Sequence, residues 1–335
     1  MAEYVVAVDA MGGDNAPGEI IKGCLMAVQE MKDVRILLSG TPETVEKAVS
    51  GAERIEFIPA SEIIDPHEAP LLAVRRKHDS SMVKCALAVK EGRAQAMVSA
   101  GSTGAVLACG ILRIGRIQGI DRPALAPVLP GMKKPFLLID AGANVDCQPE
   151  HLRQFGLMGS VYMEKVLGVK EPSVMLANIG EEPEKGSRLY KGAHQLMAAQ
   201  TAYRFAGNIE GREIPTGAAD VVVADGFDGN LLLKYTEGMA GALTGMLKAE
   251  MLSSTRTKLG ALLVKPALRA FKKRLDYEQY GGAPLLGVAG AVVKAHGSSN
   301  AVAVMNAVRQ ARRMVEGDIV GLIASGVSAL SAGTN

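Results

Sequence analysis

The sequence predicts an α/β protein with three layers, α/β/α, around a largely parallel sheet. Short runs rich in Val, Ile and Leu alternate along the 335 residues with longer amphipathic stretches, which is the pattern of βαβ units. Glycine occurs 38 times, above the usual ~7% of residues, and suits the turns that such units need. Seven tyrosines, six phenylalanines and no tryptophan disfavour aromatic-rich β-sandwiches and base-stacking nucleic-acid platforms.

Each predicted strand is a short apolar run that ends in a polar or glycine-containing turn. In chain order these runs are 4–8, 34–39, 54–59, 96–100, 124–129, 136–139, 174–177, 221–224 and 288–294. Apolar residues at three- and four-residue spacing predict helices over 22–31, 80–91, 150–167, 189–200, 231–251 and 301–315. No linker, heptad or repeat divides the chain. We therefore expect one α/β domain over residues 1–335, with or without two lobes, and a basic amphipathic helical arm at about 251–276.

The charge balance and the cysteine content restrict which partners the protein is expected to bind and in which cell compartment it is expected to work. Lys and Arg number 37 against 35 Asp and Glu, so the formal charge of +2 gives no global field for nucleic acid. The four cysteines, at 24, 85, 109 and 147, form no CxxC and predict reduced thiols rather than disulfides or a zinc site. The first residues lack an export signal, and polar residues interrupt the uncharged stretches 94–112 and 319–335. We expect a cytoplasmic protein without a membrane span.

Six predicted strands end in polar turns that contain glycine. These turns are 9–14, 99–104, 140–144, 178–182, 225–230 and 296–300. The carboxyl ends of parallel strands share one edge of a sheet, where open α/β folds bind their ligands, so we expect the turns to line one cleft. Any one of them alone is explained as well by plain chain topology, because αβ connections use glycine anyway.

The turn 99–105, Ser-Ala-Gly-Ser-Thr-Gly-Ala, is the strongest candidate for a phosphate site. Its glycines let backbone N–H groups approach an anion, its hydroxyls can donate, and a helix is expected to begin near Gly104. It matches neither GxxxxGK[ST] nor GxGxxG, so a P-loop and a conventional dinucleotide fingerprint are absent. A Ser/Thr-capped helix after a strand is the competing, purely structural interpretation.

Three further groups of residues could carry charge into the cleft. Lys185 follows three carboxylates in the turn after 174–177, and can serve as a cation for phosphate or for a developing oxyanion, or belong to a solvated loop. His296 ends a strand within His-Gly-Ser-Ser and can donate a proton or bind an anion, although most isolated histidines are structural. Four carboxylates also follow strand ends: Asp9, Asp14, Asp140 and Asp225. Such carboxylates can assemble an Mg²⁺ site or simply cap helices, and the spacing of these four does not decide between the two roles. We expect no metal and no cofactor.

One segment, 253–275, is strongly basic and contains no carboxylate. Leucines and a phenylalanine interleave its cations, and Pro266 is expected to split it into two amphipathic segments. Such a stretch can dock an acidic protein or an anionic membrane surface, or form a solvated arm or a dimer contact. The candidate docking residues are Arg256, Lys258, Lys265, Arg269, Lys272, Lys273 and Arg274.

Taken together and in order, these turns resemble the PlsX family of bacterial phosphate acyltransferases. The matching stretches span nearly the whole chain: VAVDAMGGDNAP (6–17), VSAGSTGA (98–105), DAGANVDC (140–147), NIGEE with KG (178–186), DVVVADGFDGN (220–230), YGGAPLLG (280–287) and AHGSS (295–299). Ala224 and Asp228 depart from the family's pattern. The resemblance implies a fold similar to isocitrate and isopropylmalate dehydrogenases, and the synthesis of acyl phosphate from acyl-acyl carrier protein and inorganic phosphate. It also implies a cytoplasmic homodimer beside the membrane, upstream of a glycerol-3-phosphate acyltransferase.

The resemblance also implies which residues border the reaction cleft. Catalytic roles fall to Lys185, His296 and Asn178; phosphate binding falls to Ser99, Gly101, Ser102, Thr103, Gly104, Asn144 and Asn230; and the cleft is lined by Asp9, Gly12, Gly13, Asp14, Asp140 and Asp225.

Two other functions remain open from the sequence. A Mg²⁺-dependent dehydrogenase on the same fold would use Asp140 and Asp225, but would also need a site rich in Arg and Tyr, which the sequence does not present. A carrier-protein or membrane-binding scaffold would leave the turns purely structural.

Overall fold

The computed structural model describes residues 3–275 and 280–332, and within them the strands form two sheets. The seven-stranded sheet has the order β3 (Ile55–Pro59), β2 (Val34–Gly40), β1 (Tyr4–Asp9), β4 (Ala96–Ser99), β12 (Ala291–Lys294), β11 (Ala283–Leu286) and β5 (Ala124–Leu125). The five-stranded sheet has the order β6 (Val128–Leu129), β7 (Phe136–Ile139), β10 (Val221–Val223), β8 (Val174–Asn178) and β9 (Phe205–Glu210). Pairing is parallel except around β11 and between β6 and β7.

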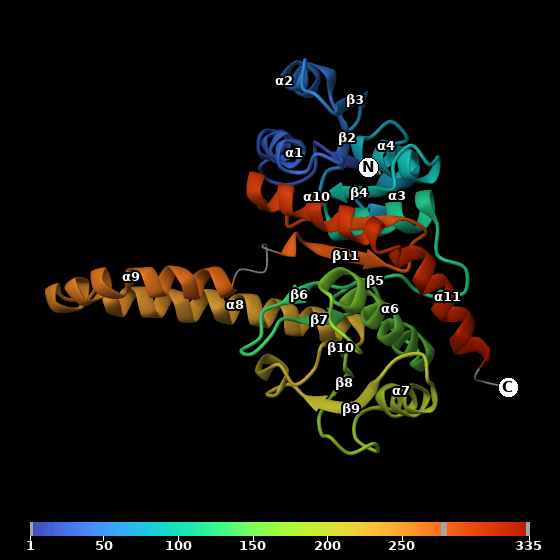
Figure 1. The fold of residues 1–335 in the computed structure, drawn as a ribbon, viewed down its shortest axis with the longest axis vertical. Coiled ribbons are helices and arrows are strands. Elements are labelled where there is room, and N and C mark those ends of the chain that lie inside the picture. Colours follow the sequence, from blue (N-terminus) through green and yellow to red (C-terminus); the bar gives the residue numbers. More distant parts are fainter. Residues whose placement is uncertain (1–2, 276–279, 333–335) are drawn as a thin grey trace.

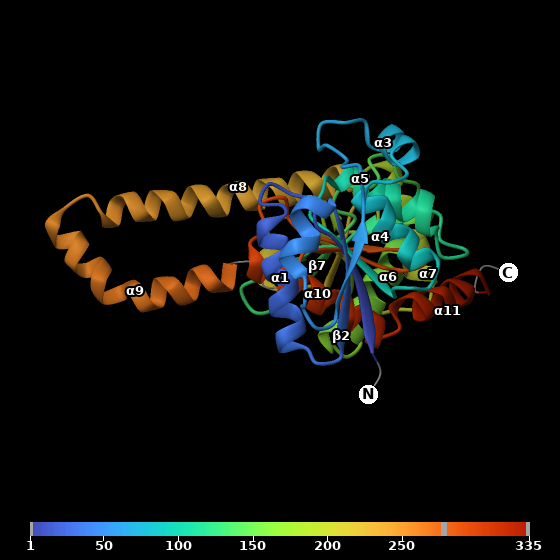
Figure 2. The ribbon, with the colours of Figure 1, turned by 90° about the horizontal axis from the view of Figure 1, so that it is seen from above.

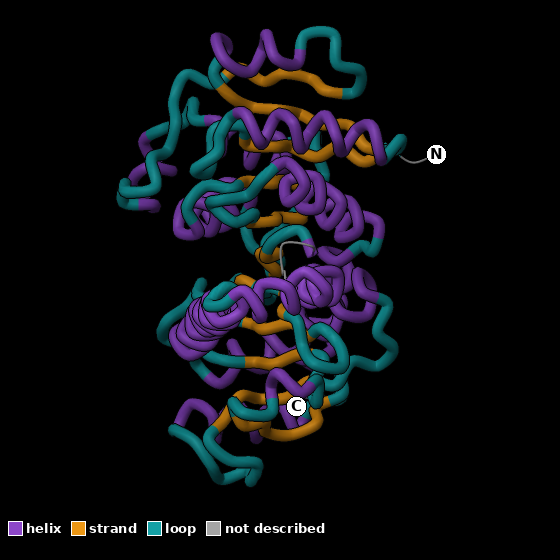
Figure 3. Tube along the Cα trace, turned by 90° about the vertical axis from the view of Figure 1, so that its left-hand side faces the viewer, coloured by secondary structure: helices purple, strands orange, loops and turns teal. Residues whose placement is uncertain are grey.

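Helices cover both faces of the sheets, so the predicted α/β/α layering is confirmed. Figure 3 shows the strands as a central column with helices on either side. The α-helices are α1 (Gly18–Glu30), α2 (Lys47–Val49), α3 (Pro70–Arg76), α4 (Ser81–Lys90), α5 (Thr103–Cys109), α6 (Pro149–Leu167), α7 (Arg188–Ala199), α8 (Gly226–Met251), α9 (Thr255–Leu275), α10 (Ala301–Glu316) and α11 (Ile319–Ala332). Short π and 3₁₀ turns occupy Pro42–Glu46, Gly110–Ile114 and Ile214–Thr216.

The two sheets share one core. Strands β7 and β10 are buried at every position, as expected for parallel strands covered on both faces. A single apolar cluster runs from Val6 and Val293 in the first sheet to Phe155 in α6 and Val221 in the second. Two smaller clusters fill the opposite faces, one under α4 and α5 and one beneath the start of α8.

The predicted strand 124–129 is two strands that belong to different sheets. The Ala126 nitrogen donates to the Pro284 carbonyl of β11, whereas the Pro127 carbonyl accepts from the Leu138 nitrogen of β7. Proline has no N–H to continue a ladder, so the chain leaves the first sheet at this point and enters the second. Two strands were not predicted: β9, which contains Gly207 at φ +93°, and β11, which begins with Ala283 and Pro284.

Helices α8 and α9 form an arm that leaves the body of the molecule (Figures 1 and 2). The prediction that Pro266 divides the basic segment is wrong, because α9 is one helix with Pro266 inside it. The helix is exposed, so water can satisfy the carbonyl that loses its partner, and Figure 2 shows α9 bending along its length.

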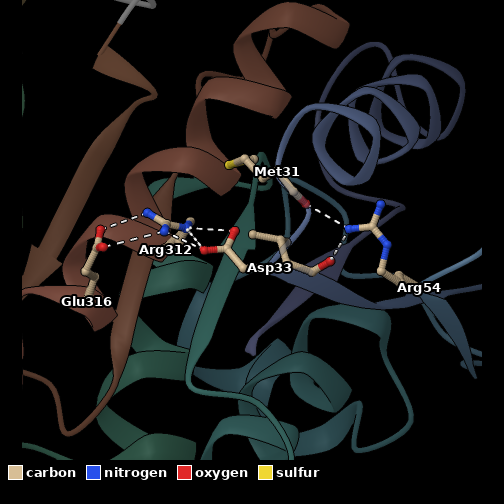
Figure 4. Close-up of polar contacts among 6 residues, drawn as sticks. Met31, Asp33, Arg54, Arg312 and Glu316 are labelled. Carbon is tan, nitrogen blue, oxygen red and sulfur yellow. Dashed lines mark hydrogen bonds and ion pairs between the residues drawn. The ribbon is translucent and has the colours of Figure 1, made fainter. Parts of the chain in front are cut away.

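Ion pairs and a hydrogen bond connect the elements at the side of the first sheet opposite to the strand-end turns. The Arg312 guanidinium contacts both carboxylate oxygens of Asp33, just before β2, and also reaches Glu316 at 2.8 Å (Figure 4). Arg54 Nη1 donates to the Met31 carbonyl at 2.8 Å. The Arg312 contact lowers the pKa of Asp33. These contacts join α10 and β3 to the loop between α1 and β2.

Candidate active site at the strand-end turns

Three turns of the first sheet meet at distances that only glycine permits. A methyl group on Gly12 would lie 2.6 Å from the Gly101 nitrogen, and one on Gly13 would lie 2.9 Å from the Gly297 carbonyl oxygen. Gly13 also has φ +99°, which disfavours other residues. The Asp14 nitrogen donates to the Gly297 carbonyl at 2.8 Å. The turns after β1, β4 and β12 are therefore brought together, as their positions in the sheet require.

Asp9 lies beneath these turns and holds them. Its carboxylate is buried and accepts from the Ser81 hydroxyl at 2.6 Å, the Ser99 hydroxyl at 2.7 Å and the Met11 nitrogen at 3.1 Å. The Ser99 hydroxyl in turn accepts from the Gly101 nitrogen at 3.0 Å. Burial raises the pKa of Asp9, while these hydrogen bonds lower it. Asp9 and Ser99 thus orient the backbone of the turn.

The remaining polar residues of the turn after β4 lie closer to solvent. Ser102 caps α5, because its hydroxyl oxygen accepts from the Ala105 nitrogen at 3.3 Å, and its own hydrogen can still donate. Thr103 is exposed. A methyl group on Gly104 would lie 2.7 Å from Pro70 Cγ, so this glycine serves packing against α3. The turn therefore caps α5 and also leaves two hydroxyl groups, those of Ser102 and Thr103, able to donate to an anion.

A second group of turns forms around Asp140, at the end of β7. The buried carboxylate accepts from the backbone nitrogens of residues 125, 142, 143 and 144 and from the Asn144 amide at 2.9 Å. Asn144 also donates to the Pro123 carbonyl at 2.8 Å. Burial raises the pKa of Asp140, and these donors lower it. Because residue 125 belongs to β5, Asp140 links the two sheets directly.

The turn after β10 packs onto the Asp140 turn. Asp225 caps α8 by accepting from the Phe227 nitrogen at 2.8 Å, and its second oxygen accepts from the Cys147 nitrogen at 3.0 Å. A methyl group on Gly226 would lie 2.3 Å from the Asn144 carbonyl oxygen. Asn230, one turn into α8, is exposed and lies beside Gly142.

The loop after β8 completes this second group. The Asn178 amide donates to the Lys185 carbonyl at 3.1 Å, and a methyl group on Gly186 would meet the Asn178 amide oxygen at 2.4 Å. The Lys185 side chain is exposed. Asn178 therefore shapes the loop that presents Lys185.

Two residues near the turns have no counterpart in the sequence predictions. The Tyr190 hydroxyl, at the start of α7, donates to Asp228 at 2.5 Å and accepts from the Asp225 nitrogen at 3.1 Å, which holds the unexpected Asp228 carboxylate against α7. Lys294 ends β12 beside the turn that contains His296. A charged residue that ends an otherwise apolar strand was the available signal for Lys294. Tyr190 lies in a helix, and no local motif marks it.

His296 lies at the surface of the first group of turns. It is exposed, and its Nδ1 lies 2.8 Å from the Ser298 hydroxyl. Asn15 donates to the Ser298 carbonyl at 3.0 Å, so the turns after β1 and β12 are tied together here. His296 and Lys185 are on separate groups of turns, which belong to different sheets.

The arm carries an apolar groove with cations along it. The groove has a volume of about 1360 Å³ and lies between α8, α9 and the body, lined by Phe136, Ile214, Leu232, Tyr235, Met239 and Leu262 among others. Lys258, Lys265 and Arg269 also line it, and Arg256 is exposed nearby. The side chains of Lys272, Lys273 and Arg274 lie outside the described residues.

The described residues contain no group of three or more His, Cys, Asp or Glu side chains arranged to hold a metal ion. Among the helices of the described ranges, none combines the length and the apolar character needed to cross a membrane.

Solved structures with low sequence identity share this fold. The EutD phosphotransacetylase from Staphylococcus aureus is 14% identical and matches with a TM-score of 0.60 over 98% of this chain and 94% of its own. A branched-chain phosphotransacylase from Enterococcus faecalis V583 is 14% identical, with a TM-score of 0.60 over 93% of this chain and 99% of its own. A 4-hydroxythreonine-4-phosphate dehydrogenase from Klebsiella pneumoniae is 14% identical and matches with a TM-score of 0.51 over 95% of this chain and 100% of its own. The predicted similarity to a dehydrogenase-like fold is confirmed.

Relatives found by sequence are much more similar to this chain than these solved structures are. The model of the family described as "Fatty acid synthesis protein" matches residues 4–321. A phosphate acyltransferase of Clostridium botulinum (strain Loch Maree / Type A3) is 52% identical over 92% of this chain and 93% of its own. One of Alkaliphilus oremlandii is 51% identical over 97% and 98%. The chain therefore belongs to the phosphate acyltransferase family and is an acyltransferase, as the strand-end turns had indicated.

Proposed function

We propose that this enzyme transfers a fatty acyl group from the thioester of acyl-acyl carrier protein to inorganic phosphate, by direct attack of phosphate on the thioester carbonyl. The observation that carries the proposal is the packing of the turns after β1, β4 and β12 at contacts only glycine allows. Such turns let backbone N–H groups approach a small anion closely. The resemblance to the PlsX family supports the choice of carrier-protein thioester and phosphate as substrates.

The reaction needs little chemistry from side chains. A phosphate oxygen forms a bond to the carbonyl carbon, the C–S bond breaks, and its electron pair leaves on sulfur, which then takes a proton from solvent. Phosphate is largely ionised near neutral pH, since its second pKa is about 6 to 7 by analogy with phosphoserine. A thiol with a pKa of about 8.5 leaves readily. Positioning can contribute up to ~7–11 kcal/mol, and one oxyanion donor ~3–4 kcal/mol.

The burial of the cysteines and the raised pKa values of their thiols argue against a covalent acyl-cysteine intermediate. Cys24, Cys85 and Cys109 are buried, and burial raises the pKa of each thiol. Cys147 lies nearest the turns, and burial together with Asp225 raises its pKa to about 12. A thiol is nucleophilic only as the thiolate, so these groups are poor acyl acceptors at neutral pH. Direct transfer avoids them.

Roles for individual residues follow from their placement. We assign phosphate binding to the turn 99–104 with Asn144 and Asn230, and stabilisation of the developing oxyanion to Lys185 or His296. Lys185 and His296 are both exposed at the turns, so each can reach a bound substrate. Asp140 and Asp225, which the dehydrogenase alternative assigns to Mg²⁺, accept hydrogen bonds from loop N–H groups instead. We assign them to holding the turns.

We assign the acyl chain to the apolar groove beneath α9. The groove is lined by Leu232, Tyr235 and Met239 of α8, and α8 begins at the turns themselves, with Asn230 only two residues before Leu232. The cations along α9 suit an acidic carrier protein or an anionic membrane surface. A homodimer that works in the cytoplasm beside the membrane, and supplies a glycerol-3-phosphate acyltransferase, completes the proposal.

A steady-state assay tests the substrate assignment. The purified enzyme is mixed with acyl-acyl carrier protein and a chelator, and free carrier thiol is measured with and without phosphate. We expect thiol release that depends on phosphate and an equal amount of acyl phosphate trapped by hydroxylamine. Full activity with acyl-coenzyme A and none with the carrier protein would overturn the carrier assignment.

Neutralising the arm tests the docking assignment. The variant replaces Arg256, Lys258, Lys265 and Arg269 with Gln, and four exposed lysines on other helices provide the matched control. We expect a raised KM for acyl-carrier protein in solution if the arm binds the carrier, and loss of binding to anionic vesicles if it binds lipid. Wild-type values in both measurements would remove the arm from the proposal.

A further inference from the structure

Lys294 lies beside the first group of turns. It is the last residue of β12 and lies in register with Ser99 at the end of β4. The Ala295 nitrogen donates to the Ser99 carbonyl at 2.9 Å, which fixes the strand end beside the turn 99–104. Lys294 therefore lies at the end of β12, between β4 and β11 of the first sheet. The charge of Lys234, in α8, also acts on Lys294.

The surroundings of this ammonium are poor in compensating charge. The side chain is partly buried, and Nζ donates to the Ala295 carbonyl. No ion pair joins it to a carboxylate within the described parts of the chain; the charges that act on it are those of Asp14, on the turn after β1, and of Lys234, which itself pairs with Glu237 at 2.8 Å. Burial and Lys234 lower its pKa to about 8, while Asp14 raises it.

Among the partly buried cations of the described residues, some are paired with carboxylates, whereas Arg54 and Arg113 donate to backbone carbonyls. Arg153 in α6 contacts Glu150 at 2.8 Å, and Lys134 contacts the buried Asp220. Burying an ammonium without an opposite charge is costly, so a lysine with only a structural role would be expected to have a carboxylate partner or to extend into water. Lys294 has neither arrangement, and it lies beside glycine turns that can accommodate an anion. An anionic ligand would supply the missing charge.

We propose that Lys294 binds the phosphate co-substrate. The inference rests on the proposed function in one respect, because it takes inorganic phosphate as the acceptor. Phosphate held by Lys294 would lie beside the turn 99–104. In this arrangement the turns orient the anion and Lys294 supplies its counter-charge.

Phosphate binding to the free enzyme provides the first test. Calorimetry at pH 7 uses inorganic phosphate as the titrant with the wild type, Lys294→Met, Lys294→Arg and the control Lys165→Met, which removes an exposed lysine of α6. We expect Lys294→Met to weaken binding by about tenfold or more, because a charge-assisted hydrogen bond is lost. Lys294→Arg and Lys165→Met are expected to stay within about threefold of the wild type. Equal binding by Lys294→Met and the wild type would overturn the inference.

The pH dependence provides a second test. Between pH 8 and 10 phosphate remains a dianion, so a loss of affinity there reports on the protein. Wild-type affinity should fall as Lys294 loses its proton above pH 8, the affinity of Lys294→Arg should stay level, and Lys234→Met should move the fall to higher pH. A fall that persists unchanged in Lys294→Arg would contradict the assignment.

Thermal stability separates a folding defect from a binding defect. Without phosphate, Lys294→Met should melt no lower than the wild type, because it removes a buried charge, and phosphate should raise the melting temperature of the wild type only. If phosphate binds equally to the wild type and Lys294→Met, the inference on Lys294 fails while the proposed function stands. If the wild type binds no phosphate, the proposed function itself fails.

Discussion

Replacing Gly12 with alanine tests the packing that shapes the phosphate site. The added methyl group would lie 2.6 Å from the Gly101 nitrogen, 2.7 Å from Asp9 Oδ2 and 3.0 Å from Ser99 Oγ. Ordinary contact begins near 3.4 Å, so the turns after β1 and β4 must separate by about 0.8 Å. A misplacement of about 1 Å can cost about 100-fold in rate, and overpacking about 1–3 kcal/mol in stability.

The assay is kcat/KM for phosphate, together with the melting temperature. We expect Gly12→Ala to lose about 100-fold in kcat/KM while remaining folded. Gly18→Ala is the matched control, since nothing lies within 4 Å of a methyl group there. Gly101→Ala should be milder, because its closest contact, at 2.4 Å, is the flexible end of Met82. Wild-type kinetics in Gly12→Ala would refute the role of these turns.

The remaining predictions concern single side chains and the arm. Lys185→Ala should raise the phosphate KM or lower kcat at least tenfold, and unchanged kinetics would remove Lys185 from the site. Cys147→Ala should retain turnover within about threefold, measured by carrier-thiol release, whereas loss of turnover would favour an acyl-cysteine. Arg312→Met should lower the free energy of unfolding by about 1 kcal/mol without changing kcat/KM. Arg312 lowers the pKa of Asp33, so this contribution is present above the unfolded pKa of about 3.9 and is lost as pH falls through the lower folded value; denaturant melts should show the two proteins converging below about pH 4. Deleting 256–274 should leave turnover with a short-chain soluble thioester but weaken carrier or vesicle binding, and normal binding would contradict the docking role.

The fold class was predictable because the residues of most strands are themselves enough to show that the strand is buried. Runs such as Phe136–Ile139 and Val221–Val223 are apolar at every position, and each is followed by a polar turn. Which of the two sheets a strand joins, in contrast, cannot be predicted from its own residues. Pro127 interrupts one apolar run, but the two halves join different sheets because β11 and β7 lie on either side of it, and the positions of these strands depend on distant segments.

The location of the candidate site was predictable from the sequence, but the roles of its individual residues were not. The sequence identified Asp9 and Asp140 as strand-end carboxylates, but whether such a group faces a ligand or binds backbone nitrogens depends on the neighbouring turns. In the structure both are buried beneath the turns that they hold. Tyr190 is significant through contacts with Asp225 and Asp228 on another element, and no spacing along the chain reveals these contacts.

Direct attack by phosphate is the central claim, and a rapid-quench experiment tests it most directly. Enzyme in excess over acyl-acyl carrier protein is mixed first without phosphate and then with it, and carrier thiol, acyl phosphate and the mass of the protein are followed over one turnover. The account predicts no thiol and no acylated protein until phosphate arrives, and then one acyl phosphate for each thiol. Thiol release before phosphate is added, with an acyl group on Cys147 or any other side chain, would contradict it.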